Sequence, residues 1–197
     1  MIRSCWLVLS LYCALPTAIL AAPAAKPLAT VPSVDLHRYA GDWYEIARYP
    51  NRFQKECASD VHVRYALQDD GKISVRNECQ KPNGKSAVAT GTAKIVDTKT
   101  NAKLKVTFFW PFYTDYWIID LDPEYRYAVV GDPDRKSLWI LSRSKELDAA
   151  VYQRILKHVA ENGFDTSKLV KTRQSINTAQ AFPVAGLLVL AAKRNFR

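Results

Sequence analysis

Apolar and polar residues alternate in eight short segments along the middle of the chain, with turn residues between them. Such alternation is typical of β-strands that bury one face. The expected strands are Trp43–Arg48, Ser59–Leu67, Lys72–Glu78, Val88–Val96, Lys103–Phe109, Tyr116–Leu121, Tyr125–Gly131 and Ser137–Arg143. The connections are short, so neighbouring strands are expected to be antiparallel. Evenly spaced strands without intervening helices indicate a barrel or a sandwich.

Helical spacing appears only after the last of these strands. Apolar residues recur at four-residue steps from Leu147 to Val159, and Gly163 is a suitable helix stop. The pattern predicts one amphipathic helix over Lys145–Asn162 and a short ninth strand near Lys168–Lys171. Together the elements predict an all-β fold, a closed barrel of eight antiparallel up-and-down strands with one C-terminal α-helix packed outside.

The two ends of the chain differ in composition from the strands. Residues 1–24 combine a basic start at Arg3, an apolar stretch too short to span a bilayer and a run of small residues, which predicts a cleaved signal peptide. An uncleaved membrane anchor is the alternative. No Cys stands at the cleavage point, so we expect export without lipidation. We further expect an N-terminal extension over 25–34, one domain over 35–175 and an apolar, poorly ordered tail over 176–197, with an interfacial anchor as the alternative for the tail.

The distribution of charge bears on which partners the protein could bind. The formal net charge of +9 is spread over isolated Lys and Arg residues. No basic block is interleaved with aromatics, so nucleic-acid binding is not supported, whereas attraction to anionic lipid surfaces stays open.

Two of the four cysteines, Cys5 and Cys13, lie in the predicted signal peptide. Cys57 and Cys79 remain and would meet an oxidising compartment after export. The two strands between them form a hairpin that brings these cysteines close together at its far end. We therefore predict a disulfide worth about 3 kcal/mol, in preference to a metal site made of two thiols alone.

Three stretches carry a resemblance to a known family. They are Gly41–Arg48 with its Gly-x-Trp-Tyr start, Leu104–Tyr113 and Leu138–Arg143. Their order and spacing resemble those of the lipocalins, and within them the bacterial, Blc-type branch that is similar to apolipoprotein D. The resemblance covers roughly residues 35–174 and implies the lipocalin form of the barrel described above.

The resemblance also implies structural roles for four residues. In the family, the Trp of the first motif closes the barrel floor and the Arg of the last motif packs across its ring. Here these residues are Trp43 and Arg143, with Gly41 beside them. The second family motif, usually Thr-Asp-Tyr, corresponds to the turn that holds Asp122 and lacks the Thr. A literal Thr-Asp-Tyr at 114–116 lies one connection too early.

Strand alternation predicts which side chains line the lumen of the expected barrel. The predicted ligand-binding lumen residues are Val61, Val63, Tyr65, Leu104, Val106, Phe108, Tyr116, Ile118, Trp139 and Leu141. Ordinary core packing is the alternative for each, but small and large apolar side chains around a capped barrel favour a pocket. Glu45 shares the inward phase of Trp43, where a carboxylate would be unusual and would mark a buried ion pair.

An aromatic stretch, Phe109–Tyr113, falls in the connection after the fifth strand, at the end opposite Trp43. Aromatic residues in a loop are normally either buried or functional. The predicted mouth residues of the binding site are Tyr49, Phe53, Trp110, Phe112 and Tyr113. Arg52 and Lys55 lie nearby and offer partners for a carboxylate or phosphate head group.

The resemblance implies that the protein binds and stores or transports a fatty acid or lysophospholipid in the cell envelope, for membrane maintenance under stress. It implies a periplasmic location, and it makes peripheral association with the outer membrane and a homodimer further hypotheses. We expect no cofactor and no metal site. Two alternatives stay open: an enzyme acting on a lumen-bound lipid, and a structural envelope protein with a filled barrel. Catalysis is disfavoured because His37, His62 and His158 are scattered and no nucleophile lies beside a base.

Overall fold

The computed structural model describes residues 26–175. The predicted signal peptide and the predicted apolar tail lie outside the described residues and stay predictions. The elements, in chain order, are α1 (Leu36–Tyr39), β1 (Gly41–Arg48), the 3-10 helix η1 (Arg52–Gln54), β2 (Ser59–Leu67), β3 (Ile73–Gln80), β4 (Ser86–Ile95), β5 (Lys103–Phe109), β6 (Phe112–Leu121), β7 (Tyr127–Gly131), β8 (Leu138–Ser142), α2 (Ala149–Glu161), the 3-10 helix η2 (Thr166–Lys168) and β9 (Val170–Lys171).

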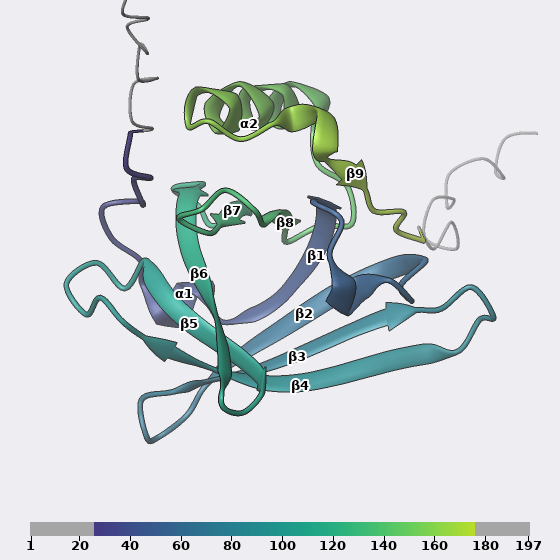
Figure 1. The fold of residues 1–197 in the computed structure, drawn as a ribbon, viewed down its shortest axis with the longest axis horizontal. Coiled ribbons are helices and arrows are strands. Elements are labelled where there is room, and N and C mark those ends of the chain that lie inside the picture. The colour runs from purple at the N-terminus through teal and green to yellow at the C-terminus, as the bar shows by residue number, and fades with distance from the viewer. Residues whose placement is uncertain (1–25, 176–197) are drawn as a thin grey trace, which may run out of the picture.

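Strands β1 to β8 form a closed, antiparallel, up-and-down barrel, which confirms the predicted fold (Figure 1). From β2 to β8 each strand pairs with the next along the chain, and β1 pairs with both β8 and β2, which closes the ring. The short β9 extends the sheet beside the end of β1. Helix α2 lies outside the barrel and covers the side formed by β7 and β8. Short connections leave antiparallel pairing as the natural arrangement of such strands.

Most predicted strand ends agree with the structure within two residues. The largest difference is at β6, which begins at Phe112 rather than at Tyr116. A two-residue turn suffices to join β5 to β6, because Phe109 and Phe112 already face each other in the ladder. Helix α2 begins later than predicted, since the Asp148 carboxylate accepts hydrogen bonds from the first free N–H groups and sets Ala149 as the first helical residue.

The apolar residues form two cores, one on each face of the sheet. The inner core fills the closed end of the barrel around Trp43, which is fully buried. The outer core lies between the sheet and α2, and helix residues Ile155 and Val159 are fully buried in it. The four-residue apolar spacing of the helix therefore records its packing on the barrel.

A β-bulge in β1 changes which of its side chains face the lumen. The register with β8 shifts between Glu45 and Ala47. Glu45 lies opposite Leu141, which belongs to the inner core, whereas Ala47 lies opposite Ile140, which belongs to the outer core. A bulge adds one residue to one strand and so reverses its in-and-out alternation. The end of β1 consequently faces α2 instead of the lumen.

The closed end of the barrel is held by Arg143. Its guanidinium lies over the Trp43 ring, 3.8 Å from the ring centroid. Its Nη2 donates to three successive carbonyls over residues 38–40, and its Nη1 donates to the Asp42 carbonyl at 2.7 Å. Gly41 has φ +94°, and a Cβ there would lie 3.4 Å from Nη1. A glycine suits this backbone conformation and leaves room for the guanidinium.

Asp122 organises the turn between β6 and β7. Its carboxylate accepts hydrogen bonds from the backbone N–H groups of Glu124 and Arg126 and from the Arg126 guanidinium at 2.8 and 2.9 Å. The hydrogen bonds from the Arg126 guanidinium hold the pKa of Asp122 below its ordinary value. The Asp of the second motif thus stabilises this turn without the Thr that usually precedes it.

The predicted disulfide between Cys57 and Cys79 is confirmed, with the two Cα atoms 5.5 Å apart. It lies at the far end of the β2–β3 hairpin, where Ser59 pairs with Gln80. The bond ties the segment that follows η1 to the end of β3, so it fixes one side of the barrel end that is opposite Trp43.

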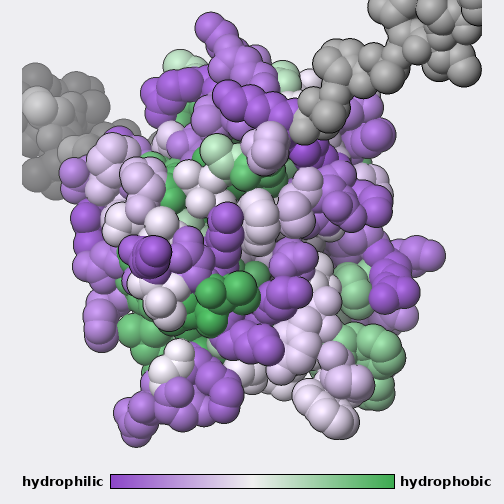
Figure 2. Space-filling view, turned by 60° about the vertical axis from the view of Figure 1, so that its left-hand side comes forward, coloured by the Kyte–Doolittle hydropathy of each residue, from purple (hydrophilic) through white to green (hydrophobic). Residues whose placement is uncertain are grey.

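The described part of the N-terminal extension packs along the barrel. Val31 N–H donates to the Ile118 carbonyl and Val34 N–H to the Thr100 carbonyl. Val34 is buried in the inner core and Leu28 in the outer core. Figure 2 shows one face of the molecule, on which hydrophilic side chains dominate and apolar ones gather in small patches. Among the described residues, no helix is long and apolar enough to span a membrane.

Candidate ligand-binding site

A cavity of about 520 Å³ lies inside the barrel. Its volume is in the range of sites that hold small molecules. Residues of six strands (β1, β2, β3, β5, β6 and β8) and of η1 line it. The predicted lumen residues that line this cavity are Val61, Val63, Tyr65, Val106, Phe108, Tyr116, Trp139 and Leu141. Most of the residues that strand alternation assigned to the lumen therefore line this one cavity.

Two predicted lumen residues lie elsewhere in the inner core. Leu104 lines a smaller cavity nearer the closed end of the barrel, of about 10 Å³. Ile118 is fully buried opposite Val130 and lines neither cavity. Both side chains point inward as predicted, but they lie too near the closed end, where the core is filled.

The mouth of the cavity is aromatic. Phe53, Phe112 and Tyr113, all predicted mouth residues, line it, and Phe109 joins them. The rings of Phe109 and Phe112 are stacked with their centroids 6.4 Å apart, and both side chains are largely exposed. Trp110, in the turn of the same hairpin, is exposed but does not line the cavity. An exposed aromatic cluster of this kind marks an interaction site.

The prediction of Tyr49 as a mouth residue is wrong. Its side chain is buried in the outer core, its ring packs edge-on against Phe164, and its hydroxyl donates to the Asp165 carbonyl at 2.8 Å. The bulge after Glu45 is the physical reason. It reverses the alternation, so Tyr49 follows Ala47 onto the face that α2 covers.

Two cations lie close to the aromatic mouth. The Arg52 guanidinium lies 5.0 Å from the centroid of the Phe53 ring, and Arg52 lines the cavity. Lys94 Nζ lies 4.4 Å from the centroid of the Tyr113 ring. Lys55, the other head-group partner expected from the sequence, is exposed and does not line the cavity. The mouth therefore combines apolar rings with positive charge.

A polar network forms one wall of the cavity around Glu45, whose residue surface is only 2% exposed. Gln54 Nε2 donates to one carboxylate oxygen at 2.6 Å, and Arg48 Nη1 donates to the other at 3.1 Å. The Thr172 hydroxyl donates to the same oxygen as Arg48. Trp139 Nε1 donates to Gln54 Oε1 at 3.1 Å, which ties β8 to η1.

Burial raises the pKa of Glu45, and this effect outweighs the opposing hydrogen bonds and the nearby Arg48 charge. A ligand carboxylate placed against this wall would face a second acidic group. The wall therefore favours a neutral ligand segment, while the cations at the mouth favour an anionic one.

Asn77 supplies a second polar point in the cavity. Its Oδ1 is buried and has no hydrogen-bond partner among residues 26–175, and Asn77 lines the cavity. A buried unpaired carbonyl oxygen is costly, and a ligand hydroxyl or amide would satisfy it.

Sequence reasoning missed several of the lining residues. Asn77 and Val75 lie in phase on the inner face of β3, so the alternation used for the other strands would have found them. Gln54 lies in η1, which begins because the Asn51 side chain accepts hydrogen bonds from two N–H groups of that short helix. No local pattern in the sequence pointed to Gln54.

No three His, Cys, Asp or Glu side chains come together within 26–175 in a way that would hold a metal ion. His62 and Arg64 both contact Asp42, on the outer face of β2. The hydrogen bonds from Arg64 are the main reason that the pKa of Asp42 falls to about 2. His62 is thus part of a surface ion-pair cluster.

The closed barrel, the outer helix and the capped cavity define the lipocalin class. A family model described as a lipocalin-like domain matches residues 34–174, and the chain belongs to this family.

Individual relatives agree with that assignment. The outer membrane lipoprotein Blc of Escherichia coli (strain K12) is 41% identical over 150 residues, which cover 76% of this chain and 84% of that protein. Apolipoprotein D of Macaca fascicularis is 30% identical over 148 residues, with 71% and 77% covered. Among solved structures, insecticyanin from the tobacco hornworm Manduca sexta shares the fold with a TM-score of 0.61 at 24% identity, covering 79% of this chain and 87% of that one.

Proposed function

We propose that the protein binds one fatty acid or lysophospholipid in its barrel and stores or transports it in the cell envelope. The observation that carries this proposal is the cavity of about 520 Å³, which is lined mainly by apolar side chains and has an aromatic mouth. Membership in a family that includes Blc and apolipoprotein D supports a ligand-binding role. Both cysteines of the described part are joined in the disulfide, so neither serves there as a free nucleophile for an enzymatic alternative.

The apolar wall supports an acyl chain as the buried part of the ligand. Transfer of each methylene from water into such an environment is worth about 0.8 kcal/mol. About ten buried methylenes therefore supply roughly the 8 kcal/mol that a micromolar dissociation constant requires, before the entropic costs of binding are subtracted. The ligand needs few polar contacts, and its affinity depends chiefly on how much of the chain is buried.

The polar groups support one orientation of the ligand. Arg52 lies at the mouth, where it offers a partner to a carboxylate or phosphate head group. Glu45 and Asn77 lie on the cavity wall and present oxygen acceptors, which suit a hydroxyl or a neutral segment better than an anion. The acyl tail then enters first and the head group stays near the aromatic rim.

The proposal also includes a location in the cell envelope. The E. coli relative is named an outer membrane lipoprotein, and the Cys57–Cys79 disulfide suits an oxidising compartment. Exposed Phe109 and Phe112, with positive charge nearby, would support peripheral contact with an anionic lipid surface. Loading from and delivery to a membrane would suit a role in membrane maintenance under stress.

Two variants of the β5–β6 hairpin test the proposal. Phe112 and Trp110 are similarly exposed, at 71% and 77%, but only Phe112 lines the cavity. Fatty-acid affinity, measured by displacement of a dansyl-labelled undecanoic acid, should weaken several-fold in Phe112→Ala and stay unchanged in the matched control Trp110→Ala. Equal affinities of the wild type and Phe112→Ala would remove the mouth from the binding site. Failure of the wild type to bind any acyl ligand would refute the proposed function itself.

A further inference from the structure

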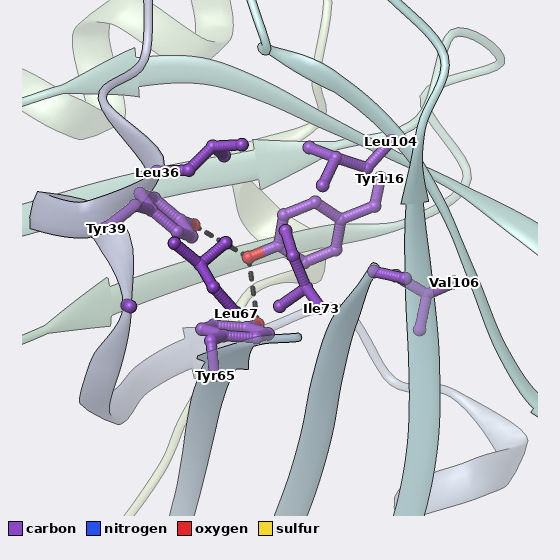
Figure 3. Close-up of a pocket in the computed structure, with 10 residues that line it drawn as sticks. Leu36, Tyr39, Tyr65, Leu67, Ile73, Leu104, Val106 and Tyr116 are labelled. Atoms are coloured by element: carbon purple, nitrogen blue, oxygen red, sulfur yellow. Dashed lines mark hydrogen bonds between the residues drawn. The ribbon is translucent and has the colours of Figure 1, made fainter. Parts of the chain in front are cut away.

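Two buried tyrosines, Tyr39 and Tyr65, and the partly buried Tyr116 share one hydrogen-bonded network in the barrel. The Tyr116 hydroxyl lies 2.7 Å from the Tyr39 hydroxyl and 2.9 Å from the Tyr65 hydroxyl. The three side chains come from α1, β2 and β6 and converge from different sides on a single point (Figure 3). The rings also touch, with centroids 5.7 Å apart for Tyr39 and Tyr65 and 6.0 Å apart for Tyr65 and Tyr116.

This tyrosine cluster lies between the two cavities of the barrel. Tyr65, Tyr116 and Val106 line the large cavity, and the same three residues line the small one. The small cavity is otherwise surrounded by α1 and by the closed-end residues of the neighbouring strands. Its remaining apolar residues are Leu36, Ala40, Leu67, Ile73, Ala93 and Leu104. At about 10 Å³ it barely has room for one water molecule, and apart from the tyrosine hydroxyls, which bond one another, its lining is apolar.

The network holds the rings in place. Each hydroxyl lies in apolar surroundings, and burial raises the pKa of all three above the ordinary tyrosine value. All three therefore remain protonated at neutral pH and keep their hydrogen bonds to one another. Turning the Tyr116 ring aside would leave the hydroxyls of Tyr39 and Tyr65 without their shared partner, which is unfavourable in an apolar interior.

We infer that Tyr65 and Tyr116, anchored by Tyr39, form the floor of the binding cavity and limit the length of acyl chain that the protein accepts. The inference rests on the proposed function and adds specificity-determining residues to it. An acyl chain that enters from the aromatic mouth meets these rings before it reaches the closed end. The small cavity beneath them is apolar space that a longer chain would occupy if the floor were absent.

A chain-length series tests the inference. Saturated fatty acids from decanoic to icosanoic acid, in two-carbon steps, are titrated against the dansyl-labelled undecanoic acid on the wild type and variants. Wild-type affinity should rise about fourfold for each added methylene until the chain reaches the floor, and then level off. Tyr116→Ala removes the ring and joins the two cavities. The plateau should move to acids at least one step longer, which bind about 15-fold more tightly than to the wild type.

Val63→Ala is the matched control. Val63 lines the large cavity but not the small one, so its truncation widens the wall and leaves the floor intact. The plateau should stay at the wild-type chain length. If Tyr116→Ala does not fold, Tyr65→Leu opens the floor from β2 with a smaller loss of volume, and the same shift is expected.

The outcomes separate the two proposals. Binding by folded Tyr116→Ala and Tyr65→Leu with a plateau at the wild-type length would overturn the inference and leave the proposed function standing. An equal shift in Val63→Ala would also overturn it, since cavity volume alone would then set the limit. Absence of fatty-acid binding by the wild type would refute the proposed function, and the inference with it.

Discussion

Removal of the Arg143 guanidinium tests how the closed end is held. In Arg143→Ala, the Trp43 ring loses the cation that lies 3.8 Å from its centroid. The Arg38 and Asp42 carbonyls lose charge-assisted hydrogen bonds of 2.6 and 2.7 Å. Hydrogen bonds to charged groups contribute about 1.5–3 kcal/mol each, and a partly desolvated cation–π contact contributes about 1–2 kcal/mol. Water reaches the half-buried Arg143 and offsets part of the sum, so we expect a net loss of about 3–5 kcal/mol.

Urea unfolding and calorimetry measure this loss. For a domain of this size, each kcal/mol lowers Tm by about 2–4 °C, so the expected decrease is about 6–20 °C. Arg143→Lys keeps a cation near the ring but lacks the planar fork, and its stability should fall between those of the wild type and Arg143→Ala. Fatty-acid affinity of the folded variants should remain, because Arg143 does not line the cavity.

Arg64→Ala is the control for loss of a surface arginine. Arg64 bonds the Asp42 carboxylate on the outer face and is mostly exposed, so its loss should cost at most about 1 kcal/mol. If Arg143→Ala were destabilised by no more than Arg64→Ala, the closed end of the barrel would not depend on the Arg143 guanidinium, and the reasoning would be refuted.

Three further predictions concern the disulfide and two buried carboxylates. Cys57→Ser with Cys79→Ser should lower the free energy of unfolding by about 3 kcal/mol in urea; reduction of the wild type should reproduce the loss, and an unchanged midpoint would contradict the prediction. The pKa of Glu45 is raised above 4.5 in the folded state, so between pH 4.5 and that raised pKa the native protein holds a proton that the unfolded chain has released. Stability should therefore fall as pH rises from 4.5 through the raised pKa, and Glu45→Gln should flatten that slope; an identical slope would show that Glu45 is not its source. The pH dependence of stability that Asp122 causes has the opposite sign, because Arg126 lowers the pKa of Asp122 below 3.8. Its stabilisation is present above that value and is lost on acidification, so Asp122→Asn should be less stable than the wild type at neutral pH and should converge with it in acid; a constant difference at all pH values would argue against the ion pair.

The barrel was predictable because its strands alternate cleanly and its connections are short. Side-chain alternation has a period of two, so residues such as Val61 and Val63 are assigned to the inner face wherever the strand is regular. The disulfide followed from the same logic, since a hairpin brings the ends of its two strands together.

The errors occurred where regularity is broken by tertiary structure. The bulge in β1 is fixed by its pairing with β8. No residue near Ala47 or Tyr49 in the sequence indicates that their side chains move from the inner to the outer face of the sheet. The position of a residue along the barrel axis was not predictable either. Leu104 and Ile118 point inward like the residues that line the large cavity, but they lie in the filled, closed end of the barrel. Alternation specifies the face of a residue but not how far from the mouth it lies.

The polar parts of the site depend on segments far apart in the chain. Glu45 meets Gln54 from the loop after β1 and Thr172 from the segment after β9. The tyrosine floor likewise joins α1, β2 and β6. Such networks arise only when the barrel has closed, so no single stretch of sequence contains their signal.

Native mass spectrometry of the protein purified from its own cells tests the lipid-binding proposal most directly. The proposal predicts that the protein carries one single-chain acyl lipid per cavity, and that an added fatty acid displaces it one for one. A protein that shows only its bare mass, both as purified and after incubation with fatty acids and lysophospholipids, would contradict it.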